Sequence, residues 1–97
     1  MIFMSVVIDN IEIDREHIEI FEGFLGGGLL LTGKALEDEG KRICDNLKNY
    51  KKGDIVQVVD NYKGKYSGIY EIKEISCSVD ASKAPAVYNF RVGLQRK

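Results

Sequence analysis

Several residue types that mark specialised proteins are scarce in this chain. Its 97 residues include one proline, no tryptophan, one histidine and two cysteines. So little proline excludes a proline-rich linker, which would need an extended polyproline conformation. No apolar run approaches the roughly 18 residues that a membrane-spanning helix requires, so we expect no membrane partner.

The two cysteines do not indicate a metal centre. Cys44 and Cys77 stand 33 positions apart, with no C-x-x-C pair and no Cys/His cluster that could complete a zinc site. Met1–Ile8 lacks the basic segment and the cleavage site of a signal peptide, so we expect a reducing compartment. Both thiols should then be free and buried, and we expect no metal and no cofactor.

The composition is that of an ordinary globular domain, but its charge is uneven. Hydrophobic residues make up 44% and charged residues 30% of the chain. Its length of 97 residues predicts one domain over residues 1–97. Residues 1–40 hold nine acidic and two basic side chains, whereas residues 41–97 hold six acidic and twelve basic ones. If the halves separate in space, they could attract copies of the chain head to tail. If folding mixes them, that attraction is lost.

The N-terminal region predicts short strands joined by turns. Asp9-Asn10 interrupts an apolar stretch and predicts a turn, and Ile11-Glu12-Ile13 alternates as a half-buried strand does. A further short strand is expected at 18–21. The segment 23–28 is too rich in glycine for regular structure and predicts a mobile loop.

That glycine-rich loop is also the first candidate contact with another subunit. Its residues in this role are Phe24, Leu25, Gly26, Gly27 and Gly28. Two apolar side chains on a flexible loop gain little in isolation, so they would become ordered against a neighbouring molecule.

A helical period follows the loop. The apolar positions on one helix face are Leu36, Gly40, Ile43, Cys44 and Leu47. Charged side chains occupy the opposite face. We expect a helix over about residues 33–50, with Thr32 as its N-cap and Gly53 ending the run.

Three strands are expected after the helix. The first covers residues 55–59, the second runs from Tyr66 to Val79, and the third alternates cleanly from Tyr88 to Leu94. The apolar residues of the second strand change parity once. This change predicts a β-bulge near Lys73-Glu74.

Together these elements predict an α+β domain. We expect an antiparallel sheet, or a small and partly open barrel, of five to six strands with one helix packed on it. Residues 1–28 would supply N-terminal strands and the glycine-rich loop. Residues 29–97 would form a core of one strand, the helix and three further strands.

Two partial motifs suggest chemistry without completing it. Gly28–Ala35 is close to a phosphate-binding loop, but Ala35 replaces the hydroxyl residue that would hold Mg²⁺, and three leucines favour burial. His17 has no recognisable nucleophile, since neither Ser5 nor Cys44 has a suitable sequence setting. The acidic residues near it lack the spacing of a calcium loop. We therefore expect no catalysis and no small-molecule substrate.

A second candidate surface interleaves lysine with tyrosine. Its members are Lys48, Lys51, Lys52, Tyr62, Lys63, Lys65 and Tyr66. Basic groups beside aromatic rings suit single-stranded nucleic acid. The same residues are common at turns and sheet edges, where lysine prevents unwanted strand pairing, and this is the favoured interpretation. The alternative is a monomeric SH3-like module that binds nucleic acid or a peptide.

The C-terminal two thirds of the chain resembles a known family. Residues 68–76 and 88–96 follow the pattern G-x-Y-x-I-x-x-I … Y-x-F-x-V-x-L-x-R. This pattern resembles the closing hairpin of phage tail proteins of the U type and of related tube and baseplate-adaptor domains. The order of strand, helix, strand, glycine-containing turn and hairpin over about residues 29–97 is also similar.

The resemblance implies a structural role in a virion tail or a related injection machine. Such a protein would form homo-oligomers and bind other tail proteins, and it would reside in the virion or, during assembly, in the host cytoplasm. The resemblance covers residue positions that pack within a sheet. It includes no catalytic residues. Burial of apolar surface would drive assembly and charge would set orientation.

Overall fold

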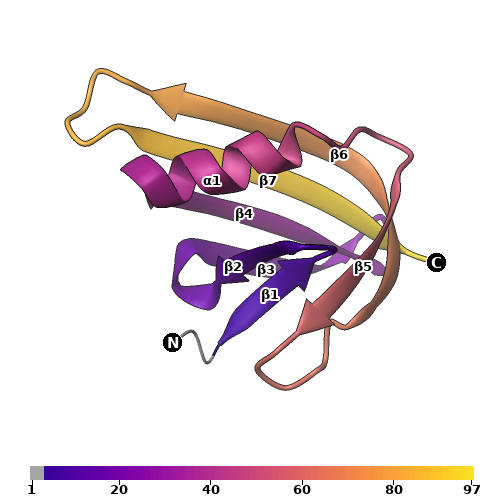
Figure 1. Ribbon diagram of the computed structural model, residues 1–97. Helices are drawn as coiled ribbons and strands as arrows, with labels where there is room; N and C mark the ends of the chain where they lie inside the picture. Colours follow the sequence, from indigo (N-terminus) through magenta and orange to yellow (C-terminus); the bar gives the residue numbers. More distant parts are fainter. Residues whose placement is uncertain (1–3) are drawn as a thin grey trace.

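A computed structural model describes residues 4–97 as seven strands, one α-helix and one short 3-10 helix (Figure 1). In chain order the elements are β1 (Ser5–Ile8), β2 (Ile11–Asp14), η1 (Arg15–His17), β3 (Ile18–Phe24), β4 (Gly28–Leu36), α1 (Glu37–Leu47), β5 (Ile55–Asp60), β6 (Gly68–Asp80) and β7 (Val87–Arg96). Met1, Ile2 and Phe3, part of the start considered above for a signal peptide, lie outside the described residues.

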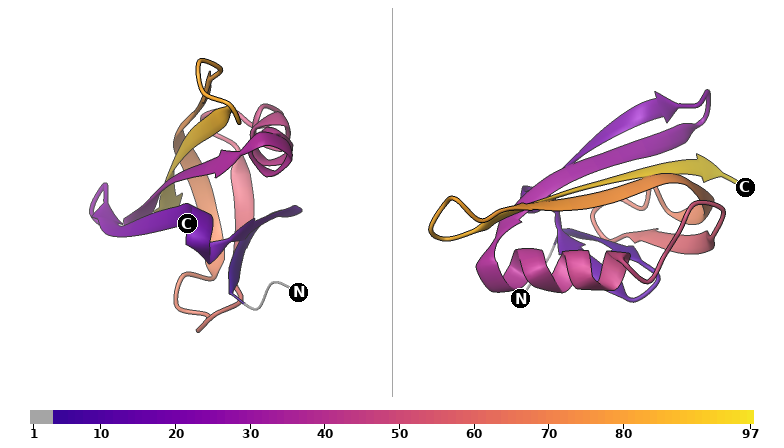
Figure 2. Two further views of the ribbon diagram at one scale, coloured as in Figure 1. Left: turned by 90° about the vertical axis from the view of Figure 1, so that its left-hand side faces the viewer. Right: turned by 90° about the horizontal axis from the view of Figure 1, so that it is seen from above.

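All seven strands belong to one antiparallel sheet in the order β2-β1-β5-β6-β7-β4-β3. The two edge strands, β2 and β3, are neighbours in the chain and are joined by η1. The sheet therefore curls into a half-barrel that stays open between them (Figures 1 and 2). This confirms an α+β fold with a partly open barrel. The expected strand number of five to six was wrong, because four strands precede the helix.

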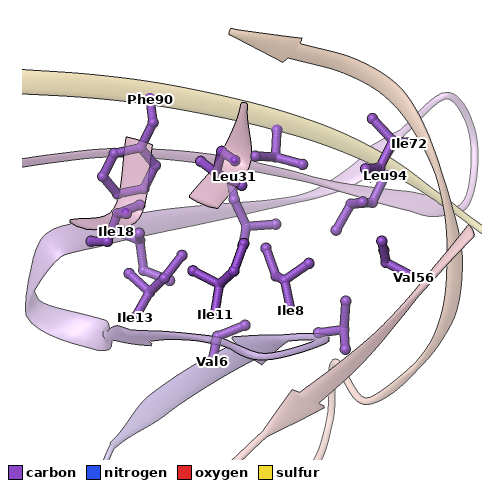
Figure 3. Close-up of a cluster of buried hydrophobic side chains, with 14 of the residues drawn as sticks. Val6, Ile8, Ile11, Ile13, Ile18, Leu31, Val56, Ile72, Phe90 and Leu94 are labelled. Atoms are coloured by element: carbon purple, nitrogen blue, oxygen red, sulfur yellow. The ribbon is translucent and has the colours of Figure 1, made fainter. Parts of the chain in front are cut away.

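Inward-facing side chains from the strands fill the half-barrel. Figure 3 shows Val6 and Ile8 of β1, Leu31 of β4, and Phe90 and Leu94 of β7 converging on this core. Every one of these side chains is at most 3% exposed. The core lies between the curled sheet and α1. It holds the sheet in its curved shape, and its side chains are not part of the outer face of the sheet.

The helix is shorter than the sequence indicates. Its residues are Glu37–Leu47, not 33–50, because the preceding residues continue β4 and pair with β7 as far as Leu36. Thr32 is therefore a strand residue and not an N-cap. Leu36 takes the N-cap position without a side-chain hydrogen bond and is 52% exposed, so it leaves the apolar face predicted for it.

Hydrogen bonds to the β6–β7 loop fix the start of α1. The Glu37 N–H donates to the Ala86 carbonyl at 3.1 Å, and the Ala86 N–H donates to Glu37 Oε1 at 3.1 Å. The buried helix positions are Gly40, Ile43, Cys44 and Leu47, as the period predicted. In residues 4–97, no helix combines the length and the apolar character needed to cross a membrane.

The strand pattern after the helix is confirmed, although the second of these strands begins at Gly68 and not at Tyr66. The pairing of β6 with β7 shifts register between Ile72 and Glu74, at the site of the expected bulge. In β7, Phe90, Val92 and Leu94 are buried. The bulge allows one long strand to place apolar side chains inward on both sides of the register shift.

Candidate assembly surface

The glycine-rich segment forms the turn of the β3–β4 hairpin. Phe24 ends β3 and pairs with Gly28, which begins β4. The Gly26 N–H donates to the Gly23 carbonyl at 3.0 Å, and the Gly27 N–H donates to the Phe24 carbonyl at 3.3 Å. The expectation of a loop without regular structure was therefore wrong. The glycines serve a tight turn, in which Gly23 and Gly26 both have positive φ angles.

Phe24 does not extend freely from this turn. Its ring lies over Gly93 of β7, where a Cβ atom would come within 2.6 Å of the ring Cζ. Gly93 thus leaves room for an aromatic ring on the outer face of the sheet. Leu25 does extend outward, with its side chain 56% exposed. Of the two apolar residues predicted to be exposed, one packs on the sheet and the other reaches solvent.

An apolar patch covers the outer face of this hairpin. Phe21 of β3 pairs with Leu30 of β4, and Leu30 pairs in turn with Gly93 beneath the Phe24 ring. Phe21 is 48% exposed. We call Phe21, Phe24, Leu25 and Leu30 the hairpin patch. Sequence reasoning missed Phe21 and Leu30. Both lie in apolar runs, so the sequence alone carried no signal of their outward orientation, which is opposite to that of the buried Leu29 and Leu31.

The hairpin patch lies beside an unpaired strand edge. Within residues 4–97, β3 pairs with β4 alone, so its other edge has no strand partner. Glu19 shares the outward parity of Phe21 on this strand and is exposed, whereas Glu22 pairs with the buried Leu29 and so points to the opposite face. Apolar area and an open strand edge therefore meet at one place. An edge of this kind can pair with another chain.

A hollow of about 520 Å³ occupies the other end of β3 and β4. Its lining is Glu16, His17, Ile18, Glu19, Thr32, Gly33, Lys34, Asn89, Phe90 and Arg91. His17 Nε2 lies 3.9 Å from Glu16 Oε1. Among the described residues, His17 makes no side-chain hydrogen bond to a hydroxyl or thiol, so the geometry supplies no activated nucleophile there.

The partial phosphate-loop motif is part of a regular strand. Gly28–Leu36 forms β4, and residues 29–36 pair continuously with β7. A phosphate-binding loop needs free backbone N–H groups that converge on an anion. In β4 these groups face neighbouring strands, and Ala35 is buried. The motif is therefore explained by strand packing.

The lysine and tyrosine residues form two groups and not one surface. Lys48, Lys51 and Lys52 lie at the end of α1 and in the loop before β5, whereas Tyr62, Lys63, Lys65 and Tyr66 lie in the loop after β5 (Figure 1). A six-residue strand separates the loops by about 16–20 Å.

The group in the β5–β6 loop is partly occupied by contacts within the molecule. Lys65 Nζ lies 3.2 Å from Glu22 Oε2, and the Tyr66 hydroxyl donates to the same carboxylate at 3.5 Å. Lys63 lies over the Tyr62 ring, with its Nζ 5.1 Å from the ring centroid. The contacts to Glu22 tie this loop to β3 across the open side of the half-barrel. Of the four residues of this loop group, only Tyr62 and Lys63 then remain to contact a nucleic acid.

The two thiols face each other between α1 and β6. Both are free, and together with Tyr88 they line a hollow of about 70 Å³. Cys44 is 2% exposed, whereas Cys77 is only partly buried, which corrects the expectation that both are buried. Burial, followed by the neighbouring Cys77 thiol, raises the pKa of Cys44 to about 12. Cys44 is therefore a protonated packing group at neutral pH.

Folding mixes the acidic and basic halves of the sequence only in part. Within residues 4–97, two ion pairs join the halves: Lys65 with Glu22, and Arg42 with Glu39. Glu71 instead pairs with Lys73 at 3.0 Å and Lys97 at 3.2 Å, all within the basic half. These cations lower the pKa of Glu71. Glu19 remains exposed on the outward face of β3, and Lys51 and Lys52 remain exposed in the loop before β5.

Comparison with known proteins adds no assignment. No protein-family model, curated protein or solved structure matches this chain. The function is therefore inferred from the fold and from the surfaces described above.

Proposed function

We propose that this protein is a structural subunit of a phage tail or a phage-like injection assembly. It binds copies of itself and neighbouring tail proteins through the hairpin patch, without catalysis. The observation that carries the proposal is the exposed apolar face of the β3–β4 hairpin beside an unpaired strand edge. The similarity of residues 29–97 to tail proteins of the U type supports the same role.

The physical basis of assembly is burial of apolar surface at the hairpin. Phe21 and Leu25 are about half exposed in the isolated chain. Covering apolar surface contributes about 25 cal/mol per Å². A stable interface buries about 800 Å² on each partner, so the hairpin patch would form its centre and the β3 edge part of its rim.

Light scattering on matched variants tests this proposal. Phe21→Thr with Leu25→Asn removes the two most exposed members of the hairpin patch. Thr suits a strand, and Asn tolerates the φ angle of 50° at Leu25. We expect the wild type to form oligomers in low salt and the double variant to remain monomeric, with at least a tenfold weaker association.

Val79→Thr is the matched control. Val79 is 51% exposed on β6 but lies far from the hairpin turn, near the β6–β7 loop. This substitution should leave association unchanged. If the double variant assembles as the wild type does while keeping the same melting temperature, the hairpin patch is not the contact.

The nucleic-acid-binding alternative stays a prediction and has its own test. Within the β5–β6 loop, Tyr62 and Lys63 are exposed and make no contact with Glu22. An SH3-like module would bind oligonucleotides with an affinity that falls steeply with salt. Lack of binding in low salt would remove this alternative, whereas loss of binding in Tyr62→Ala with Lys51→Ala would favour it.

A further inference from the structure

The free edge of β3 presents backbone groups that lack a strand partner. Within residues 4–97, β3 pairs only with β4, and Figure 2 shows it at the margin of the sheet. The Ile18 N–H donates to the Arg15 carbonyl of η1 and therefore not to β4. Because N–H groups alternate in direction along a strand, those of Ile20 and Glu22 also point to the free edge. In residues 4–97, no backbone hydrogen bond outside the β3–β4 ladder involves Ile20 or Glu22.

The other edge strand of the sheet, β2, is covered. Arg42 of α1 donates from Nη2 to the Glu12 carbonyl of β2 at 2.5 Å. A side chain or helix placed over a sheet edge prevents another strand from pairing there. Along β3, by contrast, Glu19, Phe21 and Gly23 are all exposed. The edge of β3 is therefore the place where a further strand can be added to the sheet.

A second copy of β3 fits this edge in one register. Antiparallel pairing about a two-fold axis at Phe21 would bring the free backbone groups of Ile20 on each copy opposite those of Glu22 on the other. Phe21 pairs with Leu30 inside each copy, so the two Phe21 rings would join both hairpin patches into one apolar row across the outer face. A register centred on Ile20 would place each Phe21 opposite Glu19 and break this row.

The glutamates of β3 do not oppose this pairing. Glu19 would lie opposite Gly23 of the second copy, where β3 has its register shift and no side chain. Glu22 would lie opposite Ile20, and its carboxylate is already held within its own chain by Lys65 Nζ at 3.2 Å. A register centred on Glu19 or on Glu22 would instead place two carboxylates opposite each other, which is destabilising.

We propose that two copies of this protein join through their β3 edges, antiparallel about Phe21, so that their sheets become one. This inference rests on the proposed assembly function and adds the partner, the register and the symmetry of the contact. Both copies use the same surface, so the interface is isologous and closes as a dimer. Main-chain hydrogen bonds supply affinity and the alternate side chains supply specificity. Lys51 and Lys52 lie in the loop before β5, outside this contact, and remain available to contacts between dimers.

Single cysteines test the register of this contact. In a Cys77→Ser background, Phe21→Cys places an accessible thiol at the two-fold axis, where opposite Cβ atoms would be about 5 Å apart. Glu19→Cys lies on the same face, but it and its counterpart would be separated by about 13 Å along the strands, beyond the reach of a disulfide. At a concentration where the wild type assembles, we expect diamide to link most of Phe21→Cys as a dimer on a non-reducing gel. Glu19→Cys should remain unlinked, and the exposed Val79→Cys on β6 measures random linking.

Amide hydrogen exchange of the unmodified chain gives a second readout that needs no substitution. The N–H groups of Ile20 and Glu22 face solvent in one copy and would be bonded in the dimer. We expect them to exchange at least tenfold more slowly in a concentrated sample than in a dilute one. The N–H groups of Glu19 and Phe21 point to β4 in either state, so their exchange should change less.

The outcomes separate this inference from the proposed function. If the wild type assembles but Phe21→Cys links no more than Val79→Cys and the Ile20 and Glu22 amides stay unprotected, the β3 edge is not the contact, and only this inference is wrong. Preferential linking of Glu19→Cys would overturn the register. A wild type that stays monomeric in light scattering at every concentration would overturn the proposed function as well.

Discussion

Cys44 shows how one buried side chain becomes chemically inert. Its pKa is raised from 9.0 to about 12, chiefly by burial. Only the thiolate reacts with alkylating reagents, so at pH 8 the folded state should hold about a thousandfold less reactive Cys44 than the unfolded chain. We expect maleimide to label Cys77 first and Cys44 only on unfolding, as peptide mass spectrometry would report. Equal labelling of both in the folded protein would contradict the described burial.

The same shift predicts a dependence of stability on pH. A thiol with a raised pKa stabilises the folded state fully below the unfolded value near 9, and this contribution falls as the pH rises toward 12. The loss approaches about 1.4 kcal/mol per pH unit in that window. Melting at pH 8 and pH 10 should therefore show a steeper loss for wild type than for Cys44→Ala, in which the other titrating groups are unchanged. Parallel losses would mean that Cys44 does not titrate this way.

Gly40 permits close contact between α1 and the sheet. A Cβ atom there would lie 2.6 Å from the Ala35 carbonyl oxygen and 2.7 Å from Tyr88 Cβ. Alanine would gain about 1 kcal/mol in helix propensity, but the overpacking costs about 1–3 kcal/mol. We expect Gly40→Ala to lower the free energy of unfolding in urea. The exposed control Asp38→Ala should change it by less than about 1 kcal/mol, and a stabilised Gly40→Ala would contradict the packing.

At the scale of single elements, Asp60 organises the loop after β5. Its side chain is 5% exposed, and its two carboxylate oxygens accept hydrogen bonds from the Tyr62 N–H at 3.0 Å and the Tyr66 N–H at 3.3 Å. Removing this carboxylate would leave backbone donors without partners, at about 1–3 kcal/mol. We expect Asp60→Ala to lower the melting temperature accordingly.

Asp80 offers a comparison for that prediction. It accepts a hydrogen bond from the Ser82 N–H at 3.1 Å in the β6–β7 loop, which is exposed. Water can replace that bond, so Asp80→Ala should cost much less than Asp60→Ala. If the two substitutions cost the same, burial is not what makes Asp60 important.

Among the helices and strands, hydrophobic periodicity predicted the structure wherever one segment followed one period throughout. The alternation of β7 and the parity change of β6 were sufficient, because each follows from which side chains face the core. The start of α1 was not predictable in this way. Residues 33–36 carry a weak signal for either structure, and pairing with β7 decides in favour of strand. Intrinsic propensity alone, without the pairing partner β7, does not determine whether these residues form a strand or a helix.

The hairpin patch was only half predictable for a related reason. Phe24 and Leu25 stand out beside glycines, but Phe21 and Leu30 lie in apolar runs that give no outward face on their own. Their exposure depends on the register of β3 with β4. The space that Gly93 leaves for the Phe24 ring depends on β7, more than sixty residues further along the chain. Contacts so distant in sequence are set by the whole sheet.

At the scale of the whole molecule, charge should control assembly. Glu19 on the outward face of β3 and Lys51 and Lys52 before β5 are exposed, and exposed charges are screened over about 10 Å in 0.1 M salt but about 30 Å in 0.01 M. We therefore expect association to weaken several-fold as salt rises across this range. Association that strengthens throughout would indicate a contact driven by apolar burial without charge pairing.

The central claim is that the outer face of this half-barrel binds protein. The most direct test is the solution mass of the unmodified chain, measured by sedimentation equilibrium in low salt across a wide concentration range. Our account predicts a weight-average mass that rises above the 10.9 kDa of one chain as concentration increases. A mass that remains at that of one chain at the highest concentration would contradict it.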